Sequence, residues 1–138
     1  MIYSLMYISE ATDDFKKEML SDILETARKF NKEKGITGLL LYTNETFIQN
    51  LEGSKEDVMN LYLKIKQDKR HCSVFEIYSE ELEERNFENW SMGYKVPEGI
   101  ELEEIEGLVN EEKVVGELKK HGAQAMRIMK RIYERSKE

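Results

Sequence analysis

The sequence has little cysteine and no long hydrophobic run. The one cysteine, Cys72, excludes an intrachain disulfide, which suits a reducing compartment. The longest apolar run, GLLLY, falls far short of the ~20 residues that cross a bilayer. The first residues lack the basic segment and apolar core of a signal peptide. We therefore expect a cytoplasmic protein with no membrane partner.

Positive charge is also scarce. The net charge of -7 and the absence of a basic patch argue against nucleic-acid binding. Two histidines and one cysteine give no metal-ligand spacing, and His71 and Cys72 are neighbours that face opposite ways on a strand. There is no glycine-rich dinucleotide motif and no P-loop. We therefore predict that the protein has no metal site and is not a nucleotide-dependent enzyme.

What the sequence does contain is an alternation of strand and helix patterns over 138 residues, enough for one core. Strands are predicted at 2–9, 35–43, 47–53, 72–79 and 90–96, and helices at 15–34 and from Ser54, read as a capping residue, to about Asp68. This β-α-β-β-α-β-β order predicts an α+β, ferredoxin-like sheet with two helices on one face. Helices near 102–109 and about 111–135 are expected to cover the other face. Residues 1–97 would then form the main domain and 98–138 a helical extension.

The stretch FIQNLEG places an amide between apolar neighbours. Side chains alternate along a strand, so Phe47, Gln49 and Leu51 share one face. Burying Gln49 without partners would cost about 1–3 kcal/mol. Either a polar group meets Gln49 there, or the face is half exposed and the residue is unremarkable.

Two further polar groups point to the same layer. Asn31 continues the apolar stripe of the first helix, although an asparagine near a helix end can also bond a free carbonyl. Tyr7 shares a strand face with Tyr3 and Leu5, where it can also be a core tyrosine. Together with Gln49, these residues indicate a ligand lodged between helix and sheet.

The motifs carry the interpretation further. The chain resembles the BLUF family, blue-light sensors that bind FAD, through motifs that occur in the family's order and cover about two thirds of the sequence. These are LMYIS (5–9), ARKFN (27–31), GITGLLLY (35–42), FIQNLEG (47–53), QDKRH (67–71) and RNFENWSMG (85–93). The resemblance implies the ferredoxin-like fold, with a flavin between the two helices: FAD, or FMN or riboflavin in the same pocket.

The resemblance also implies residue roles. Tyr7 matches the tyrosine that donates an electron to the excited flavin, and Gln49 the glutamine that bridges this tyrosine to the ring. Asn31 matches the asparagine that fixes the O4/N3 edge of the ring. Trp90 and Met92 match the pair that reports the light state.

Three residues of the QDKRH motif complete the implied flavin-binding set. Asp68, Arg70 and His71 correspond to the segment beside the ring and the ribityl chain.

About 45 residues follow Gly93, fewer than a typical output domain needs. We therefore expect a stand-alone bacterial photoreceptor that is not an enzyme. It would signal by contact with an unknown downstream protein or as a homo-oligomer. The alternatives are a flavin reductase, a hydrolase on the same fold, or a light-insensitive flavin-binding or interaction domain.

Overall fold

The computed structural model describes residues 1–13, 15–16, 18–43, 45–88, 92–95 and 125–134. Its elements are β1 (Ile2–Ala11), α1 (Met19–Lys34), β2 (Thr37–Thr43), β3 (Thr46–Gly53), α2 (Lys55–Lys66), β4 (His71–Leu82) and β5 (Gly93–Lys95). Residues 125–134 are helical and are called the C-terminal helix below. The predicted α+β, ferredoxin-like order is confirmed.

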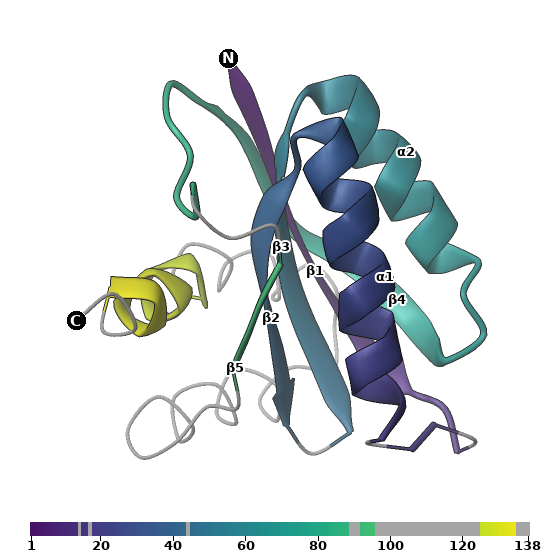
Figure 1. The fold of residues 1–138 in the computed structure, drawn as a ribbon. Coiled ribbons are helices and arrows are strands. Elements are labelled where there is room, and N and C mark those ends of the chain that lie inside the picture. Colours follow the sequence, from purple (N-terminus) through teal and green to yellow (C-terminus); the bar gives the residue numbers. More distant parts are fainter. Residues whose placement is uncertain (14, 17, 44, 89–91, 96–124, 135–138) are drawn as a thin grey trace.

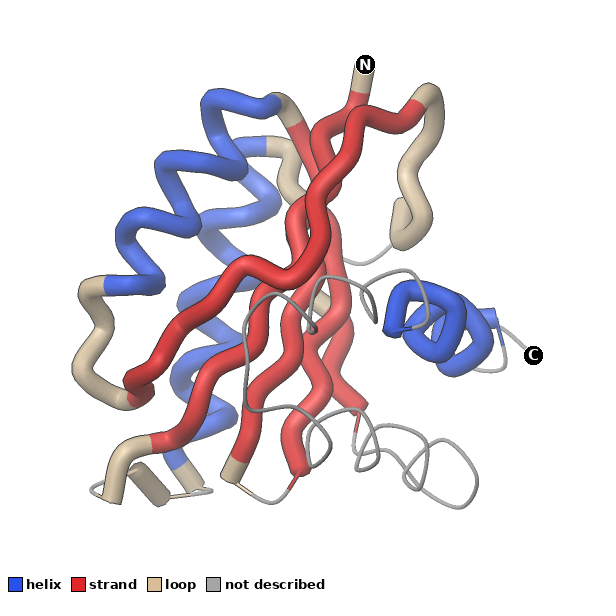
Figure 2. Tube along the Cα trace, turned by 180° about the vertical axis from the view of Figure 1, so that it is seen from behind, coloured by secondary structure: helices blue, strands red, loops and turns tan. Residues whose placement is uncertain are grey.

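The five strands form one sheet in the order β4-β1-β3-β2-β5. Neighbours are antiparallel except β2 and β5, which run parallel. Helices α1 and α2 lie side by side on one face, and the C-terminal helix lies on the other (Figures 1 and 2). None of the helices in the described part of the chain is long and apolar enough to cross a membrane.

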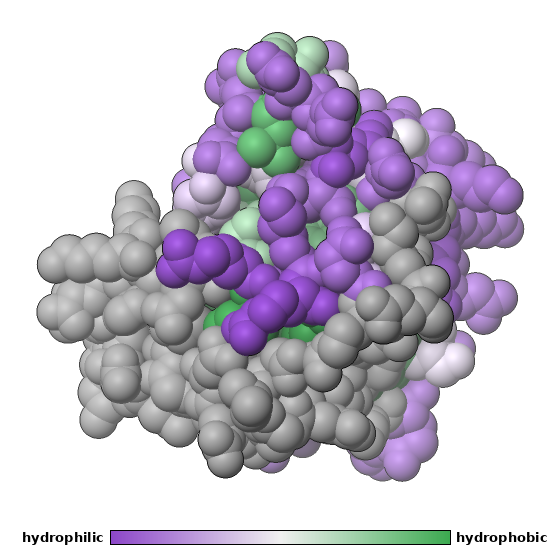
Figure 3. All heavy atoms as spheres, turned by 90° about the vertical axis from the view of Figure 1, so that its left-hand side faces the viewer, coloured by the Kyte–Doolittle hydropathy of each residue, from purple (hydrophilic) through white to green (hydrophobic). Residues whose placement is uncertain are grey.

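The sheet separates two hydrophobic cores. On β2, Leu40 belongs to the core under α1 and α2, whereas Leu39 and Leu41 belong to the core under the C-terminal helix. This alternation explains why the strand is apolar on both faces. The C-terminal helix contributes Met129 and Ile132 to its core, and its outward residues are polar (Figure 3).

The predicted start of the first helix was wrong. The pattern placed it at Phe15, but α1 begins at Met19. The amide of Phe15 instead closes a turn onto the carbonyl of Thr12 at 2.9 Å. Its ring packs against Phe47, with ring centroids 5.2 Å apart. The aromatic contact with the sheet therefore replaces an extra helical turn.

The start of the second helix was predicted correctly. Ser54 caps α2, and its hydroxyl accepts a hydrogen bond from the amide of Asp57 at 3.2 Å.

The strand predicted at 72–79 is longer in the structure, where β4 extends over His71–Leu82. Of the strand predicted at 90–96, the structure describes Gly93–Lys95 and Met92 before it. Trp90 and the helix predicted at 102–109 lie outside the described residues.

Candidate functional site

A cavity of about 290 Å³ opens between the two helices and the sheet. Most of its wall is apolar, with a few polar groups at separate points, which is the usual character of a small-molecule site. The lining residues come from α1, α2, four strands and the loop before β4: Tyr7, Ile23, Thr26, Ala27, Phe30, Asn31, Leu40, Phe47, Gln49, Leu61, Lys64, Ile65, Asp68, Arg70 and His71.

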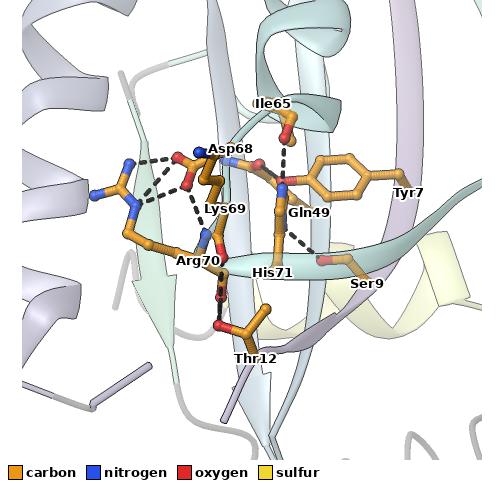
Figure 4. Close-up of polar contacts among 9 residues, drawn as sticks. All are labelled: Tyr7, Ser9, Thr12, Gln49, Ile65, Asp68, Lys69, Arg70 and His71. Carbon is orange, nitrogen blue, oxygen red and sulfur yellow. Dashed lines mark hydrogen bonds and ion pairs between the residues drawn. The ribbon is translucent and has the colours of Figure 1, made fainter. Parts of the chain in front are cut away.

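Gln49 lies in the floor of this cavity. It is on β3, directly opposite Tyr7 on β1 and Leu40 on β2, and is 7% exposed. Its Oε1 accepts a hydrogen bond from the hydroxyl of Tyr7 (Figure 4). Its Nε2 donates to the sulfur of Met92 at 3.1 Å. The half-exposed interpretation of Gln49 was therefore wrong, because the amide is buried and bonded at both ends.

The chemistry of the two partners fixes the orientation of this amide. The sulfur of Met92 can accept a hydrogen bond but has none to donate. A reversed amide would turn its oxygen toward that sulfur and lose the bond. The hydroxyl of Tyr7 can either donate or accept, so it tolerates both orientations. Rotation of Gln49 therefore changes the contact with Met92 more than the contact with Tyr7.

Tyr7 is held in its neutral form. Its side chain is 3% exposed, and burial raises the pKa of its hydroxyl well above the ordinary value of 10.0. The nearby Tyr62 and Asp68 add smaller contributions in the same direction. The ring of Tyr62 lies 5.7 Å from that of Tyr7, centroid to centroid. A neutral phenol that donates to an amide oxygen has a defined path for its proton.

Asn31 lies at the end of α1 and is 1% exposed. Its backbone carbonyl accepts hydrogen bonds from the amides of Gly35 and Ile36. The helix end is thus closed by backbone groups, and the residue also lines the cavity. Asn31 and Gln49 place two amide side chains, one from a helix and one from a strand, in the same cavity wall.

Asp68 and Arg70 form one side of the cavity. The guanidinium of Arg70 contacts both oxygens of Asp68, with Nε at 2.9 Å from Oδ1 (Figure 4). Hydrogen bonds from Arg70 lower the pKa of Asp68, and the carboxylate in turn raises the pKa of Arg70. Both groups therefore stay charged at neutral pH.

His71 is bonded through both ring nitrogens. Its Nε2 meets the carbonyl of Ile65, and its Nδ1 lies 3.0 Å from the hydroxyl of Ser9. Because a carbonyl can only accept, Nε2 carries the proton. In the neutral ring, Nδ1 then accepts from Ser9. This arrangement keeps the ring edge-on to Tyr7, with centroids 6.3 Å apart.

Met92, directly before β5, reaches the same layer. It is 2% exposed and belongs to the core under α1 and α2. Its carbonyl accepts a hydrogen bond from Nε of Arg28 on α1 at 2.8 Å. Of the two residues predicted to report the light state, Met92 contacts Gln49, and Trp90 lies outside the described residues.

Sequence reasoning missed two contributors. Ser9 could have been found, because it follows Leu5 and Tyr7 on the same strand face. Arg28 could not, because its partner Met92 is 64 positions away and is brought near by the sheet. Within the described ranges, no group of three or more His, Cys, Asp or Glu side chains could hold a metal ion.

Comparisons with known proteins match this region. A family model described as BLUF, sensors of blue-light using FAD, matches residues 2–93. The photoactivated adenylate cyclase subunit beta of Euglena longa is 45% identical over 84 residues, which is 61% of this chain and 10% of that protein. Its counterpart in Euglena gracilis is 43% identical over 90 residues, 64% of this chain and 10% of that protein. The chain thus spans about a tenth of these curated relatives.

Solved structures agree with the fold over more of the chain. BlsA in its ground state has a TM-score of 0.75 and 31% identity, covering 94% of this chain and 88% of that one. The dark-state structure of BlrB, a BLUF protein, has a TM-score of 0.73 and 26% identity, covering 94% and 92%. These two neighbours are similar to this chain over nearly their whole length.

Proposed function

Because this chain belongs to the BLUF family, the sensors of blue light that use FAD, we propose that Tyr7, Gln49 and Met92 are the residues through which it responds to light. One observation carries this proposal. A buried tyrosine and a buried amide that both line the cavity form a continuous hydrogen-bonded chain with a buried methionine sulfur. Such a chain can change its pairing without any change in fold.

The cavity is suited to a flavin. Its volume of about 290 Å³ lies near the lower end of the range for small-molecule sites, ~300 Å³. Apolar side chains such as Ile23 and Leu40 offer flat walls to an aromatic ring. Asn31 and Gln49 offer amide donors and acceptors to its polar edges, and Asp68, Arg70 and His71 would border the rest of the cofactor. The family uses FAD, and FMN or riboflavin would present the same ring.

A bound flavin would supply blue-light absorption and, in its excited state, an acceptor for an electron from a phenol. Tyr7 is proposed as the donor, because it lines the cavity and is kept neutral by burial. As its electron leaves, its hydroxyl proton can move along the existing bond to Oε1 of Gln49. Both return to Tyr7 afterwards, so no net reaction takes place.

Gln49 would be the switch. Rotation or tautomerisation of its amide exchanges a donor for an acceptor at one place, and each partner must then re-pair. Each exchanged hydrogen bond is worth about 0.5–1.5 kcal/mol. A few together can bias a two-state element by ~1–3 kcal/mol, the usual size of allosteric coupling.

The output is proposed to pass by contact rather than by catalysis. The region that matches the family is the sensor region, and the curated relatives are photoactivated cyclases of which it is a small part. We propose that residues 1–97 sense light, that residues 98–138, the extension predicted to be helical, meet an unknown protein partner, and that the chain self-associates. A cytoplasmic location and a bacterial source stay predictions.

The binding part of the proposal is tested through Asn31. Asn31→Ala removes the amide from the wall and should weaken flavin binding roughly tenfold, the effect of losing one or two hydrogen bonds. The measurement is a titration of flavin-free protein with FAD. Asn60→Ala, an exposed asparagine on α2, is the control and should bind normally. Equal FAD affinity of the two variants would mean that Asn31 serves only to close the end of α1.

The signalling part is tested by comparing darkness with blue light. Sizing and pull-down of the FAD-bound protein under both conditions should give a different assembly or a different captured partner. A protein that behaves identically in both would be a light-insensitive member of the fold. A protein whose flavin bleaches with NADH would be a reductase.

A further inference from the structure

The connection from β4 to β5 must cross the sheet, because these two strands form its opposite edges. The loop after β4 runs on the side that carries the C-terminal helix (Figures 1 and 2). The connection ends at Met92, whose side chain belongs to the core on the other side, under α1 and α2. One segment of chain therefore touches both cores.

A buried carboxylate holds this segment in the middle of the crossing. Glu52 lies on the central strand β3, is 0% exposed, and faces away from the cavity. Its Oε1 accepts hydrogen bonds from two backbone amides, that of Asn86 at an N–O distance of 2.6 Å and that of Phe87 at 3.1 Å. Its Oε2 accepts from the side-chain amide of Asn86 at 2.8 Å and the hydroxyl of Ser4 at 3.1 Å.

Its environment is unusual for a carboxylate. All four of these donors are neutral, and the nearby Arg85 donates to the backbone carbonyl of Glu52, at 2.9 Å, rather than to its side chain. Burial raises the pKa of Glu52 against the opposing effect of these bonds. A buried carboxylate whose four donors are all neutral is costly, but an ionised carboxylate can accept all four hydrogen bonds at once. The arrangement therefore favours a holding role for Glu52.

Asn86 and Phe87 contact the C-terminal helix, and the chain runs on from them to Met92 under α1 and α2. Phe87 is fully buried and packs edge-to-face on Tyr133 of the C-terminal helix, with centroids 5.3 Å apart. The side-chain amide of Asn86 lies 3.7 Å from the sulfur of Met126 on the same helix. Five residues further along the chain, Met92 accepts from Gln49.

We infer that Glu52 is a positioning residue for the light response. By holding the backbone at Asn86 and Phe87, it sets how Met92 meets Gln49 and ties that contact to the C-terminal helix. The inference rests on the proposed role of the Gln49–Met92 pair. It assigns no contact with the flavin to Glu52, which acts from the opposite face of the sheet.

The variant Glu52→Gln keeps the size of the side chain and one oxygen for the two backbone amides. Its new amide nitrogen faces the amide nitrogen of Asn86, so either two donors oppose each other or the Asn86 amide turns over and loses its donation to Met126. The double variant Glu52→Gln/Asn86→Asp restores a donor facing an acceptor. A positioning role predicts that Glu52→Gln alters the response and that the added Asn86→Asp restores it.

Two measurements on the FAD-bound protein distinguish positioning from general stability. In darkness, the methyl NMR signal of Met92, assigned by its loss in Met92→Leu, should shift or broaden in Glu52→Gln and return in the double variant. After blue light, the dark-recovery rate of Glu52→Gln should change about fivefold, the size of one lost hydrogen bond, in the same direction as Met92→Leu. In the Met92→Leu background, Glu52→Gln should add almost nothing.

Equal fold-changes in the two backgrounds, with an unmoved Met92 signal, would overturn the inference and leave Glu52 a structural residue. If Glu52→Gln does not fold, Asn86→Ala removes one of the four bonds and should give the same pattern with smaller changes. An unmodified protein with no light-induced shift would overturn the proposed function, and this inference with it. This outcome is distinct from a failure of the inference alone, because it is seen in the unmodified protein and requires no variant.

Discussion

The amide of Gln49 has a different partner at each end. The phenol of Tyr7 can donate or accept, whereas the sulfur of Met92 accepts alone. This asymmetry gives the residue two unequal arrangements, which a switch requires. These two hydrogen bonds also explain how an amide can lie between Phe47 and Leu51 on a buried strand face.

Tyr7→Phe should abolish the light-induced spectral shift and leave fold and flavin in place. The ring keeps its contacts with Tyr62 and His71, but the proton that must follow the electron is gone. Gln49 also loses one hydrogen bond, so a small offset of the dark spectrum is expected. Absorption spectroscopy under blue light measures both effects.

Tyr62→Phe is the matched control, because that ring lies beside Tyr7 and is the alternative phenol donor. It should keep the shift. A full shift in Tyr7→Phe together with a lost shift in Tyr62→Phe would assign the electron to Tyr62.

At the residue scale, alternation along single strands and helices was enough to find Tyr7, Asn31 and Gln49 as cavity-facing groups. The resemblance added Met92. Neither source gave Arg28 or the holding role of Glu52, because their partners lie far away in sequence and the crossing of the β4–β5 connection brings them near.

At the scale of elements, the order of strands and helices followed from hydrophobic periodicity. The start of α1 did not, because Phe15 fits a helical pattern as well as it fits the aromatic contact with Tyr42 and Phe47. Local pattern cannot weigh a contact that forms only when the β2–β3 hairpin is in place. The division at residue 97 stays a prediction, since the structure describes no residue from 96 to 124.

Ser54→Ala should lower the free energy of unfolding by about 1 kcal/mol, the usual cost of an N-cap. The amide of Asp57 loses its acceptor, and α2 carries one wall of the cavity. Denaturant unfolding measures the change. Ser21→Ala, an exposed position in the first turn of α1 that is not its N-cap, is the control and should be neutral or slightly stabilising. Equal losses in both variants would contradict a capping role.

At the scale of the whole molecule, the sheet separates a ligand core from a core that holds the C-terminal helix. Gln49 and Glu52 lie on the same central strand with their side chains on opposite faces, and both contact residues of the β4–β5 connection, at Met92 and at Asn86. Through its described residues, the connection therefore contacts both the cavity residue Gln49 and the C-terminal helix.

Glu52 should also make global stability depend on pH. Burial raises the pKa of Glu52 in the folded state above the ordinary value of 4.5. The folded protein therefore binds a proton at Glu52 more tightly than the unfolded chain does. That contribution is present below pH 4.5 and is lost as the pH rises through the folded-state pKa. The free energy of unfolding of the unmodified protein, relative to Glu52→Gln, should fall from pH 4 to pH 7.

Denaturant unfolding of both proteins across this range provides the test. Asn60→Ala, an exposed substitution on α2 that removes no titratable group, is the control and should keep a constant offset from the unmodified protein. A constant offset for Glu52→Gln as well would mean that the carboxylate has no raised pKa in the folded state.

The central claim is that Gln49 is the switch, and absorption spectra of FAD-bound variants before and after blue light test it most directly. Leucine keeps the volume of glutamine and removes the amide, so Gln49→Leu should bind FAD and show no red shift. The unmodified protein and Gln67→Leu, an exposed substitution after α2, should both shift and recover in darkness. A normal, reversible red shift in Gln49→Leu would contradict the account.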